Sequence, residues 1–126
     1  MKKIVTVLWH NSANRLNMLK PQTDKFVHLK VYSAAALSDG RQDLNNLYRD
    51  MKDADAFLFQ VTSSDSAWAE IEEYAEKFQT PIIYVGGESA GKIKTKDQMK
   101  HSAICNRFYA YSGTDNMLNM LKYICS

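Results

Sequence analysis

The stretch that decides the fold is Ala56-Phe57-Leu58-Phe59-Gln60-Val61-Thr62-Ser63-Ser64-Asp65-Ser66-Ala67-Trp68. It opens as an apolar run and becomes a cluster of small polar side chains before a segment with helical apolar spacing. A continuous apolar run of strand length is typical of a strand buried on both faces, which favours a parallel sheet between helices. Ligands in such folds bind just beyond the carboxyl ends of the strands. We therefore expect a crevice where this strand, residues 56–61, ends.

Three further segments complete the predicted sheet. Residues 3–9 and 82–85 are apolar runs like the first, whereas residues 27–31 alternate between apolar and polar side chains, which indicates an edge strand with one wet face. Segments with the helical spacing of apolar residues separate the strands and follow the last one. The alternation predicts a three-layer α/β fold, flavodoxin-like or Rossmann-like, with a four-stranded parallel sheet of order 2-1-3-4.

Local signals predict where the helices begin and end. A first helix should run from the end of the first strand to about Pro21, and Ser38-Asp39-Gly40 predicts a turn. Residues 86–91 predict a glycine-rich loop. The helix that carries Trp68 is expected to be capped by one of three residues, Ser64, Asp65 or Ser66.

A capping box, Thr95-x-x-Gln98, predicts the start of a long helix. Gly113 is expected to end this helix in a left-handed conformation, and a last helix should begin at Thr114 or Asp115. The side chains expected to face the core from the long helix are Ala103, Ile104, Phe108 and Tyr111.

The composition is that of an ordinary globular domain. Of the 126 residues 45% are hydrophobic, and 16 basic against 14 acidic side chains give a net charge of +2. The chain has neither the basic stripe typical of nucleic-acid binding nor an apolar run near the roughly 20 residues of a membrane span. Met1-Lys2-Lys3 leads into a strand rather than a signal peptide, so we expect a cytoplasmic protein. Cys105 and Cys125 form no Cys-x-x-Cys pair and are expected to be buried or half-buried thiols.

We expect one α/β domain over residues 1–126, at the N-terminus of a much longer chain. The helix predicted near residue 114 runs almost to Ser126 without a terminator. Four strands also make a small sheet for a doubly wound fold. Both features favour a chain that continues.

The predicted crevice gathers polar and aromatic side chains that follow the strands. Because the carboxyl ends of parallel strands meet at one edge of the sheet, residues that come directly after the strands are expected to lie close together. The candidate ligand-binding residues are Trp9, His10, Ser12, Ser63, Ser64, Asp65, Trp68, Gly86, Gly87 and Glu88.

The residue types at this crevice are typical of two chemistries. Residues 86–92 match Gly-x-x-x-x-Gly-Lys after a strand, but Ile93 stands where a phosphate loop needs a hydroxyl for magnesium, which favours an ordinary glycine-rich loop. His10 with Asp65 or Glu88, beside the serines, contains the residue types of a hydrolytic triad. The chain has no Gly-x-Ser-x-Gly elbow, and serines before a helix are also what capping alone produces.

The two tryptophans are further candidates for ligand contact. Trp9 and Trp68 are both expected to flank the crevice, where their flat faces can stack on a planar ligand. Packing in the core or in a lid is the alternative, and the preferred one by default. A metal site is not predicted, because His10, His28 and His101 lie on different elements without ligand spacing.

Several segments together resemble a known family. The most distinctive is Tyr109-x-x-x-Gly113-x-x-Asn116-x-x-Asn119-Met120-Leu121-x-Tyr123-Ile124, and the others are residues 3–9, 54–59, 63–68 and 81–87. They resemble the large subunit of cobaltochelatase (CobN-type) and the related H subunit of magnesium chelatase, over nearly all of the chain. Ser112 stands where the family usually has the first glycine of a pair.

The resemblance implies a subunit that takes part in inserting a divalent metal into a tetrapyrrole, a corrin or a porphyrin, with cobalt insertion in cobalamin biosynthesis favoured. In that family the large subunit binds the macrocycle, and separate AAA+ partner subunits hydrolyse ATP with magnesium. This domain is therefore expected to hold no cofactor, to carry no catalytic residue, and to contact the tetrapyrrole or the remainder of its own chain. The alternatives are a free-standing flavodoxin-like module that binds a nucleotide or flavin, and a small hydrolase.

Overall fold

The computed structural model describes residues 1–62, 65–111 and 113–126. At its centre lies a four-stranded, fully parallel sheet with the strand order β2-β1-β3-β4. The strands are β1 (Lys3–Leu8), β2 (His28–Ser33), β3 (Ala56–Phe59) and β4 (Ile82–Tyr84). The predicted α/β class and strand order are therefore confirmed, although β3 ends earlier than predicted.

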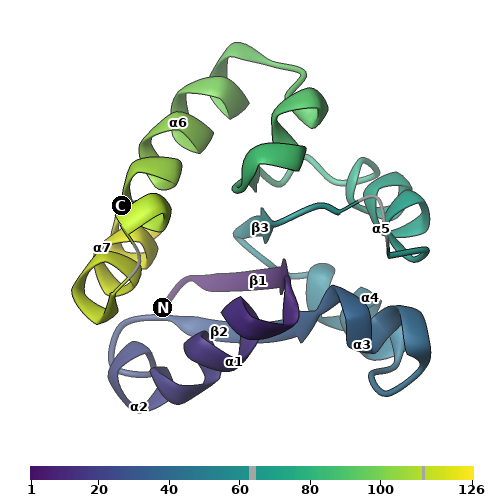
Figure 1. The fold of residues 1–126 in the computed structure, drawn as a ribbon, viewed down its shortest axis with the longest axis horizontal. Helices are drawn as coiled ribbons and strands as arrows, with labels where there is room; N and C mark the ends of the chain where they lie inside the picture. The colour runs from purple at the N-terminus through teal and green to yellow at the C-terminus, as the bar shows by residue number, and fades with distance from the viewer. Residues whose placement is uncertain (63–64, 112) are drawn as a thin grey trace.

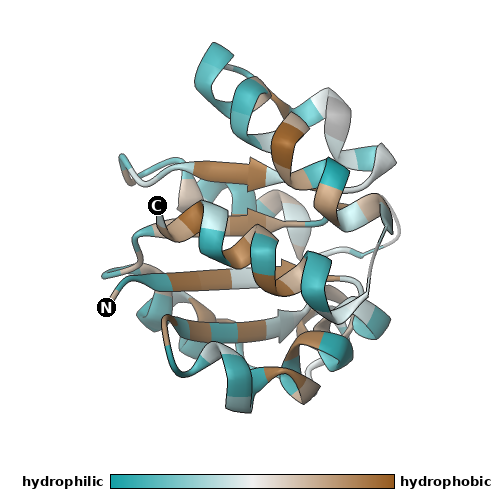
Figure 2. Cartoon of the chain, turned by 90° about the vertical axis from the view of Figure 1, so that its left-hand side faces the viewer, coloured by the Kyte–Doolittle hydropathy of each residue, from teal (hydrophilic) through white to brown (hydrophobic). Residues whose placement is uncertain are grey.

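The exposure of the strands explains the sequence patterns that predicted them. Every residue of β3 and β4 is buried, as is every residue of β1 after Lys3. β2 lies at one edge and keeps the alternation, with His28 and Lys30 exposed and Leu29 buried. Figure 2 shows the brown of the apolar strands against the alternating colours of this edge strand.

Helices cover both faces of the sheet and complete the three predicted layers. On one face pack α1 (His10–Met18), α6 (Lys96–Tyr111) and α7 (Thr114–Cys125). On the other pack α3 (Ala34–Asp39), α4 (Leu44–Met51) and α5 (Trp68–Ala75). Figure 1 shows α6 and α7 to the left of the sheet and α4 and α5 to its right.

The first predicted helix is divided in two. α1 ends at Met18, and the short α2 (Lys20–Thr23) carries Pro21 in its first turn. Proline is accepted there because the first N–H groups of a helix have no partner within it. Pro21 therefore begins a new helix instead of marking the end of the old one.

The turn predicted at residues 38–40 is wrong except for its last residue. Ser38 and Asp39 belong to α3, which begins where Ser33 Oγ accepts the N–H of Ala36 at 3.2 Å. Gly40 ends this helix in the left-handed conformation, with φ 86°. A helix of six residues, capped at both ends, stands where we expected loop.

The predicted caps of α5 are wrong within the described residues. Neither Asp65 nor Ser66 caps the helix, because Ala67 occupies the N-cap and no described side chain bonds there. The N–H of Ala67 instead donates to Ser38 Oγ of α3 at 3.3 Å. Ser64, the third candidate, lies outside the described residues.

The predicted capping box does open α6. The N–H of Gln98 donates to Thr95 Oγ1 at 3.1 Å, while the Gln98 side chain accepts the N–H of Lys94 at 2.8 Å. The segment before it, predicted as a loop, contains the 3₁₀ helix η1 (Gly87–Lys92).

The predicted inward face of α6 is confirmed only at Phe108, which packs against the core. The buried residues of α6 are Ser102 and Cys105. Of the residues expected to face the core, Ala103 and Tyr111 are exposed, and Ile104 and Phe108 are half-buried.

The edge of β4 explains this choice of face. Ser102 Oγ accepts the N–H of Tyr84 at 3.0 Å, and Asn106 Nδ2 donates to the Tyr84 carbonyl, also at 3.0 Å. The outer edge of a sheet presents unpaired N–H and C=O groups that need polar partners. α6 therefore turns a polar pair toward β4 and covers an edge that a further strand would otherwise occupy.

Gly113 joins α6 to α7 with φ 80° and ψ 155°, so its φ is positive as predicted but its ψ is not that of the left-handed helix. This backbone region is open essentially to glycine alone. Gly113→Ala is therefore expected to lower the free energy of unfolding by about 1–3 kcal/mol, measured by urea denaturation. Gly87→Ala is the control, since φ is not positive there and a Cβ meets nothing within 4 Å. Equal stability of the two variants would contradict this role of Gly113.

Candidate ligand site

The carboxyl ends of β1 and β3 form the topological switch point of the sheet. The two strands are neighbours, but α1, which follows β1, packs on one face and α5, which follows β3, packs on the other. Ligands of open α/β sheets bind in the crevice that opens where the helices diverge in this way. Trp9 follows β1 at this point, and Gln60 follows β3.

Gln60 fills this switch point. Its side chain is 3% exposed, and Oε1 accepts the Trp9 N–H at 3.1 Å and the Tyr109 hydroxyl at 2.7 Å. Ser12 Oγ contacts the same hydroxyl, so α1, β3 and α6 are joined by one hydrogen-bond network. Burial raises the pKa of Tyr109, which keeps its hydroxyl protonated as the donor to Gln60. Ser12, a predicted site residue, therefore has a structural role in this network. The roles of Gln60 and Tyr109 were not predicted from the sequence.

Gly86 lies close against the Gln60 side chain. Its φ is 88°, and a Cβ at this position would lie 3.2 Å from Gln60 Cγ. Its N–H donates to Asn106 Oδ1 at 2.9 Å. Gly86 therefore allows β4 to end close against Gln60, whereas Gly87 is exposed and opens η1.

His10 is paired with a serine that sequence reasoning did not select. His10 Nδ1 lies 3.1 Å from Ser33 Oγ, at the end of β2. Ser33 is 4% exposed, and the same oxygen caps α3. A hydroxyl held in this way is not presented to a substrate, so the pair does not form the nucleophile and base of a hydrolase.

A pocket of about 530 Å³ lies between α5 and η1, at the carboxyl ends of β3 and β4. We call it the α5–η1 pocket. Its apolar lining residues are Val61, Trp68 and Ala69, and its polar ones are Thr62, Asp65, Ser66, Glu72, Glu88 and Lys92. The structure thus brings together three of the predicted site residues, Asp65, Trp68 and Glu88. Ser63 and Ser64 lie outside the described residues.

The two tryptophans lie in different surroundings. Trp68 is 4% exposed and packs edge-on against Phe59, with ring centroids 5.3 Å apart. Trp9 is 42% exposed and does not line the α5–η1 pocket. Trp68 is therefore a core residue with one side at the pocket, and Trp9 is the tryptophan exposed at the end of β1.

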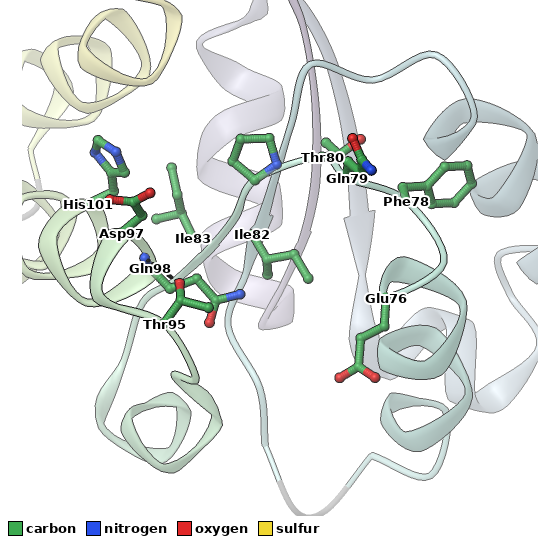
Figure 3. Close-up of a pocket in the computed structure, with 11 residues that line it drawn as sticks. Glu76, Phe78, Gln79, Thr80, Ile82, Ile83, Thr95, Asp97, Gln98 and His101 are labelled. Atoms are coloured by element: carbon green, nitrogen blue, oxygen red, sulfur yellow. Dashed lines mark hydrogen bonds between the residues drawn. The ribbon is translucent and has the colours of Figure 1, made fainter.

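A second pocket, of about 350 Å³, lies at the opposite end of β4. Figure 3 shows Ile82 and Ile83 between His101 and Asp97 of α6 on one side and the segment after α5 on the other. His101 is held by α7, since its Nδ1 lies 2.6 Å from the Tyr123 hydroxyl. No sequence motif predicts this pocket, and it lies away from the strand ends where α/β folds bind ligands.

The cysteines are the buried and half-buried thiols that were predicted. Burial raises the pKa of Cys105 to about 12 and also raises the pKa of Cys125, which keeps both thiols protonated at neutral pH. Within residues 1–62, 65–111 and 113–126, no group of three or more His, Cys, Asp or Glu side chains could hold a metal ion. The same part of the chain contains no helix with the length and apolar character needed to cross a membrane.

Comparisons of the chain with protein-family models, with curated proteins and with solved structures find no match. The resemblance to chelatase subunits therefore stays a prediction.

Proposed function

We propose that the chain is a doubly wound α/β domain that contacts a ligand without carrying out chemistry on it. More specifically, we propose that it is the N-terminal domain of the large, tetrapyrrole-binding subunit of an ATP-dependent metal chelatase, with cobalt insertion in cobalamin biosynthesis favoured. The most distinctive segment of the resemblance supports this proposal. Its first residue, Tyr109, holds Gln60 at the crevice, and Gly113 makes the connection between α6 and α7.

The exposed ring of Trp9 is the observation that carries the proposal. It stands at the end of β1, 42% exposed, with its backbone N–H held by Gln60 at 3.1 Å. A large exposed aromatic side chain at a strand end offers a flat apolar face to a macrocycle that is apolar in its middle. The α5–η1 pocket suits this ligand less, because a ring fringed with carboxylates would meet the carboxylates that line it.

The proposal divides the work between subunits. Residues 87–92 form η1, and Ile93 stands where a phosphate loop has its magnesium-binding hydroxyl. We therefore propose that AAA+ partner subunits bind ATP and magnesium. The remainder of the parent chain would carry the metal-insertion site. The complex would work in the cytoplasm.

Trp9→Leu is expected to weaken tetrapyrrole binding about tenfold, because stacking on an aromatic side chain contributes about 1–3 kcal/mol and about 1.4 kcal/mol is a tenfold change. The measurement is the quenching of tryptophan emission during titration with a corrin and, separately, with a porphyrin. Trp68 remains as the reporter, since the chain has 2 tryptophans. Energy transfer to a tetrapyrrole acts across a small domain, so the concentration at half-saturation, not the depth of quenching, locates the site.

Phe26→Leu is the matched control, because this half-buried aromatic residue lies before β2, at the amino-terminal end of the strands, whereas Trp9 lies at the carboxyl end. It should bind the tetrapyrrole like the wild type. Unchanged half-saturation in Trp9→Leu would remove Trp9 from the site. A stop codon directly after Ser126 would contradict the chelatase subunit, and saturable binding of a flavin in place of tetrapyrrole would favour the flavodoxin-like alternative.

A further inference from the structure

We propose that the second pocket binds a small neutral molecule that carries a hydrogen-bond donor and an acceptor side by side, as an amide or an amino-heterocycle does. We call it the β4–α6 pocket, because it lies at the amino-terminal end of β4 and α6 forms one of its walls. Its volume of about 350 Å³ falls within the roughly 300–1,000 Å³ of small-molecule sites. This inference goes beyond the tetrapyrrole contact at Trp9 and does not depend on it.

The β4–α6 pocket lies at the outer edge of the sheet. Ile82 and Ile83 both line it, although Ile82 belongs to the core cluster on one face of the sheet and Ile83 to the cluster on the other. A pocket that touches both faces of one strand has to pass around the open side of that strand. Its other wall is α6, the helix that binds the outer edge of β4 at Tyr84 (Figure 3).

The main chain of Ile82 points its N–H and C=O toward this edge. The N–H of Phe57 donates to the Pro81 carbonyl at 2.9 Å, so Pro81 directs its main-chain groups at β3. The main-chain groups of successive residues alternate between the two edges of a strand. Those of Ile82 therefore point outward, as do those of Tyr84, which α6 binds.

α6 binds the edge of β4 at Tyr84 but leaves it open at Ile82. Ile82 is 6% exposed, and neither its N–H nor its C=O has a hydrogen-bond partner among the residues that the structure describes. Gln98 lies one helical turn before Ser102 and would be next to reach the strand, but its Oε1 accepts the Lys94 N–H at 2.8 Å in the capping box. Buried main-chain groups are almost always paired in folded proteins. An open pair in the wall of a pocket therefore points to partners that arrive with a ligand.

The lining defines the chemistry of that ligand. The N–H and C=O of one residue require an acceptor and a donor next to each other, and Gln98 Nε2 supplies a further donor, since only the oxygen of this amide is used by the helix. Glu76 and Asp97 line the pocket, and no lysine or arginine of the described chain does, which disfavours a phosphate or carboxylate. Phe78 adds a flat apolar surface that suits a ring.

A small molecule fits this edge better than a strand of another chain. A peptide that extends a sheet pairs with several residues along the edge. Here Ser102 and Asn106 already occupy the main-chain groups of Tyr84, and β4 is only 3 residues long. One open residue gives room for one donor and acceptor pair.

The experiment compares three neutral probes of nearly the same shape. 2-Aminopyrimidine carries a donor beside a ring nitrogen that accepts, whereas 2-(dimethylamino)pyrimidine keeps the ring nitrogens and has no donor. We expect the first to bind at least about tenfold more tightly than the second, because the second leaves the Ile82 carbonyl unpaired. 2-(Methylamino)pyrimidine restores one N–H beside a methyl group, so it should bind within about threefold of 2-aminopyrimidine and exclude bulk as the cause.

The Ile82 amide reports on the site directly. Of the 2 prolines only Pro81 precedes an isoleucine, so proline labelled at its carbonyl carbon and isoleucine labelled at its nitrogen give one NMR signal, that of Ile82. This signal should move downfield on binding as the N–H gains an acceptor. In the protein without probe its hydrogen should exchange at least about tenfold faster than that of the Tyr84 amide, which donates to Ser102. Saturation with 2-aminopyrimidine should slow the exchange.

Gln98→Glu should weaken the binding of 2-aminopyrimidine at least about fivefold, because a carboxylate oxygen replaces the donor that faces the ring nitrogens. The helix start is kept, since glutamate serves at this position of a capping box as well as glutamine does. Gln22→Glu is the matched control, because Gln22 is an exposed residue of α2 that does not line the pocket. It should leave the affinity unchanged.

Four outcomes would overturn the proposal. They are equal affinity for 2-aminopyrimidine and its dimethyl derivative, no saturable shift of the Ile82 signal, slow exchange of the Ile82 amide in the protein without probe, and unchanged affinity in Gln98→Glu. Tighter binding of a capped alanine tripeptide than of 2-aminopyrimidine would also overturn it, in favour of an added strand.

Discussion

Phe59→Ala is expected to lower the free energy of unfolding by about 3–5 kcal/mol, a large part of the roughly 5–15 kcal/mol that stabilises a typical domain. Phe59 is fully buried at the end of β3, in the core cluster that also contains Phe57, Trp68 and Tyr84. Its ring centroid lies 5.3 Å from that of Trp68, 5.7 Å from Phe57 and 6.2 Å from Tyr84. Alanine would remove all three ring contacts and leave a cavity that a sheet between two helical layers cannot close.

The measurement is urea unfolding followed by far-ultraviolet circular dichroism and by tryptophan emission, which reports directly on the packing of Phe59 against Trp68. Tyr111→Ala is the control, because this aromatic side chain is 80% exposed at the end of α6. It should change stability by no more than about 0.5 kcal/mol. A loss below about 1 kcal/mol for Phe59→Ala would mean that β3 is not the centre of the core.

The sheet could be predicted because burial on both faces leaves a dense local signal. β3 and β4 are short unbroken apolar runs, the alternation in β2 marks an edge, and short right-handed crossovers leave few possible orders. α3 gave no comparable signal. Its six residues are too few to show a helical period, and Ser38-Asp39-Gly40 is equally typical of a turn and of a helix end.

The inward face of α6 could not be predicted from apolar spacing, because the surface it covers is a polar strand edge. Burying Ser102 is favourable only because its Oγ accepts the otherwise unpaired N–H of Tyr84. That N–H has no partner in a neighbouring strand only because β4 is the outermost strand. The correct face of the helix thus depends on the strand order, which is information from the whole fold.

The candidate site could be predicted only in part, because some of its residues also depend on the whole fold. Asp65 and Glu88 follow the strands whose ends meet at the α5–η1 pocket, so topology was enough to select them. Glu72 was missed, although it lies one helical turn after Trp68 and a search for i, i+4 neighbours would have found it. Gln60 was missed because its side chain turns back across the switch point to reach groups far away in the sequence.

Asn106→Leu is expected to have the second large effect on stability, because it leaves two main-chain groups unpaired at about 1–3 kcal/mol each. Asn106 Oδ1 accepts the Gly86 N–H at 2.9 Å, and Nδ2 donates to the Tyr84 carbonyl at 3.0 Å. Leucine has a similar size but no polar atom for either group. Asn46→Leu, the same change on the exposed side of α4, is the matched control. Urea denaturation gives both values, and equal effects would contradict the role of Asn106.

A double-mutant cycle with Ser102→Ala tests whether α6 closes the sheet as a unit. Ser102 and Asn106 bind the N–H and the carbonyl of Tyr84, and Asn106 Nδ2 also donates to the Ser102 carbonyl at 2.7 Å. Loss of either side chain should loosen the helix on the strand and weaken the other contact, so we expect a coupling energy above about 0.5 kcal/mol. Hydrogen exchange at the Tyr84 amide should be faster in both single variants, including Asn106→Leu, which leaves the acceptor of that amide in place. If the losses of unfolding free energy are additive and hydrogen exchange at the Tyr84 amide is unchanged in Asn106→Leu, the two contacts are independent. α6 would then not close the edge of β4 as a unit.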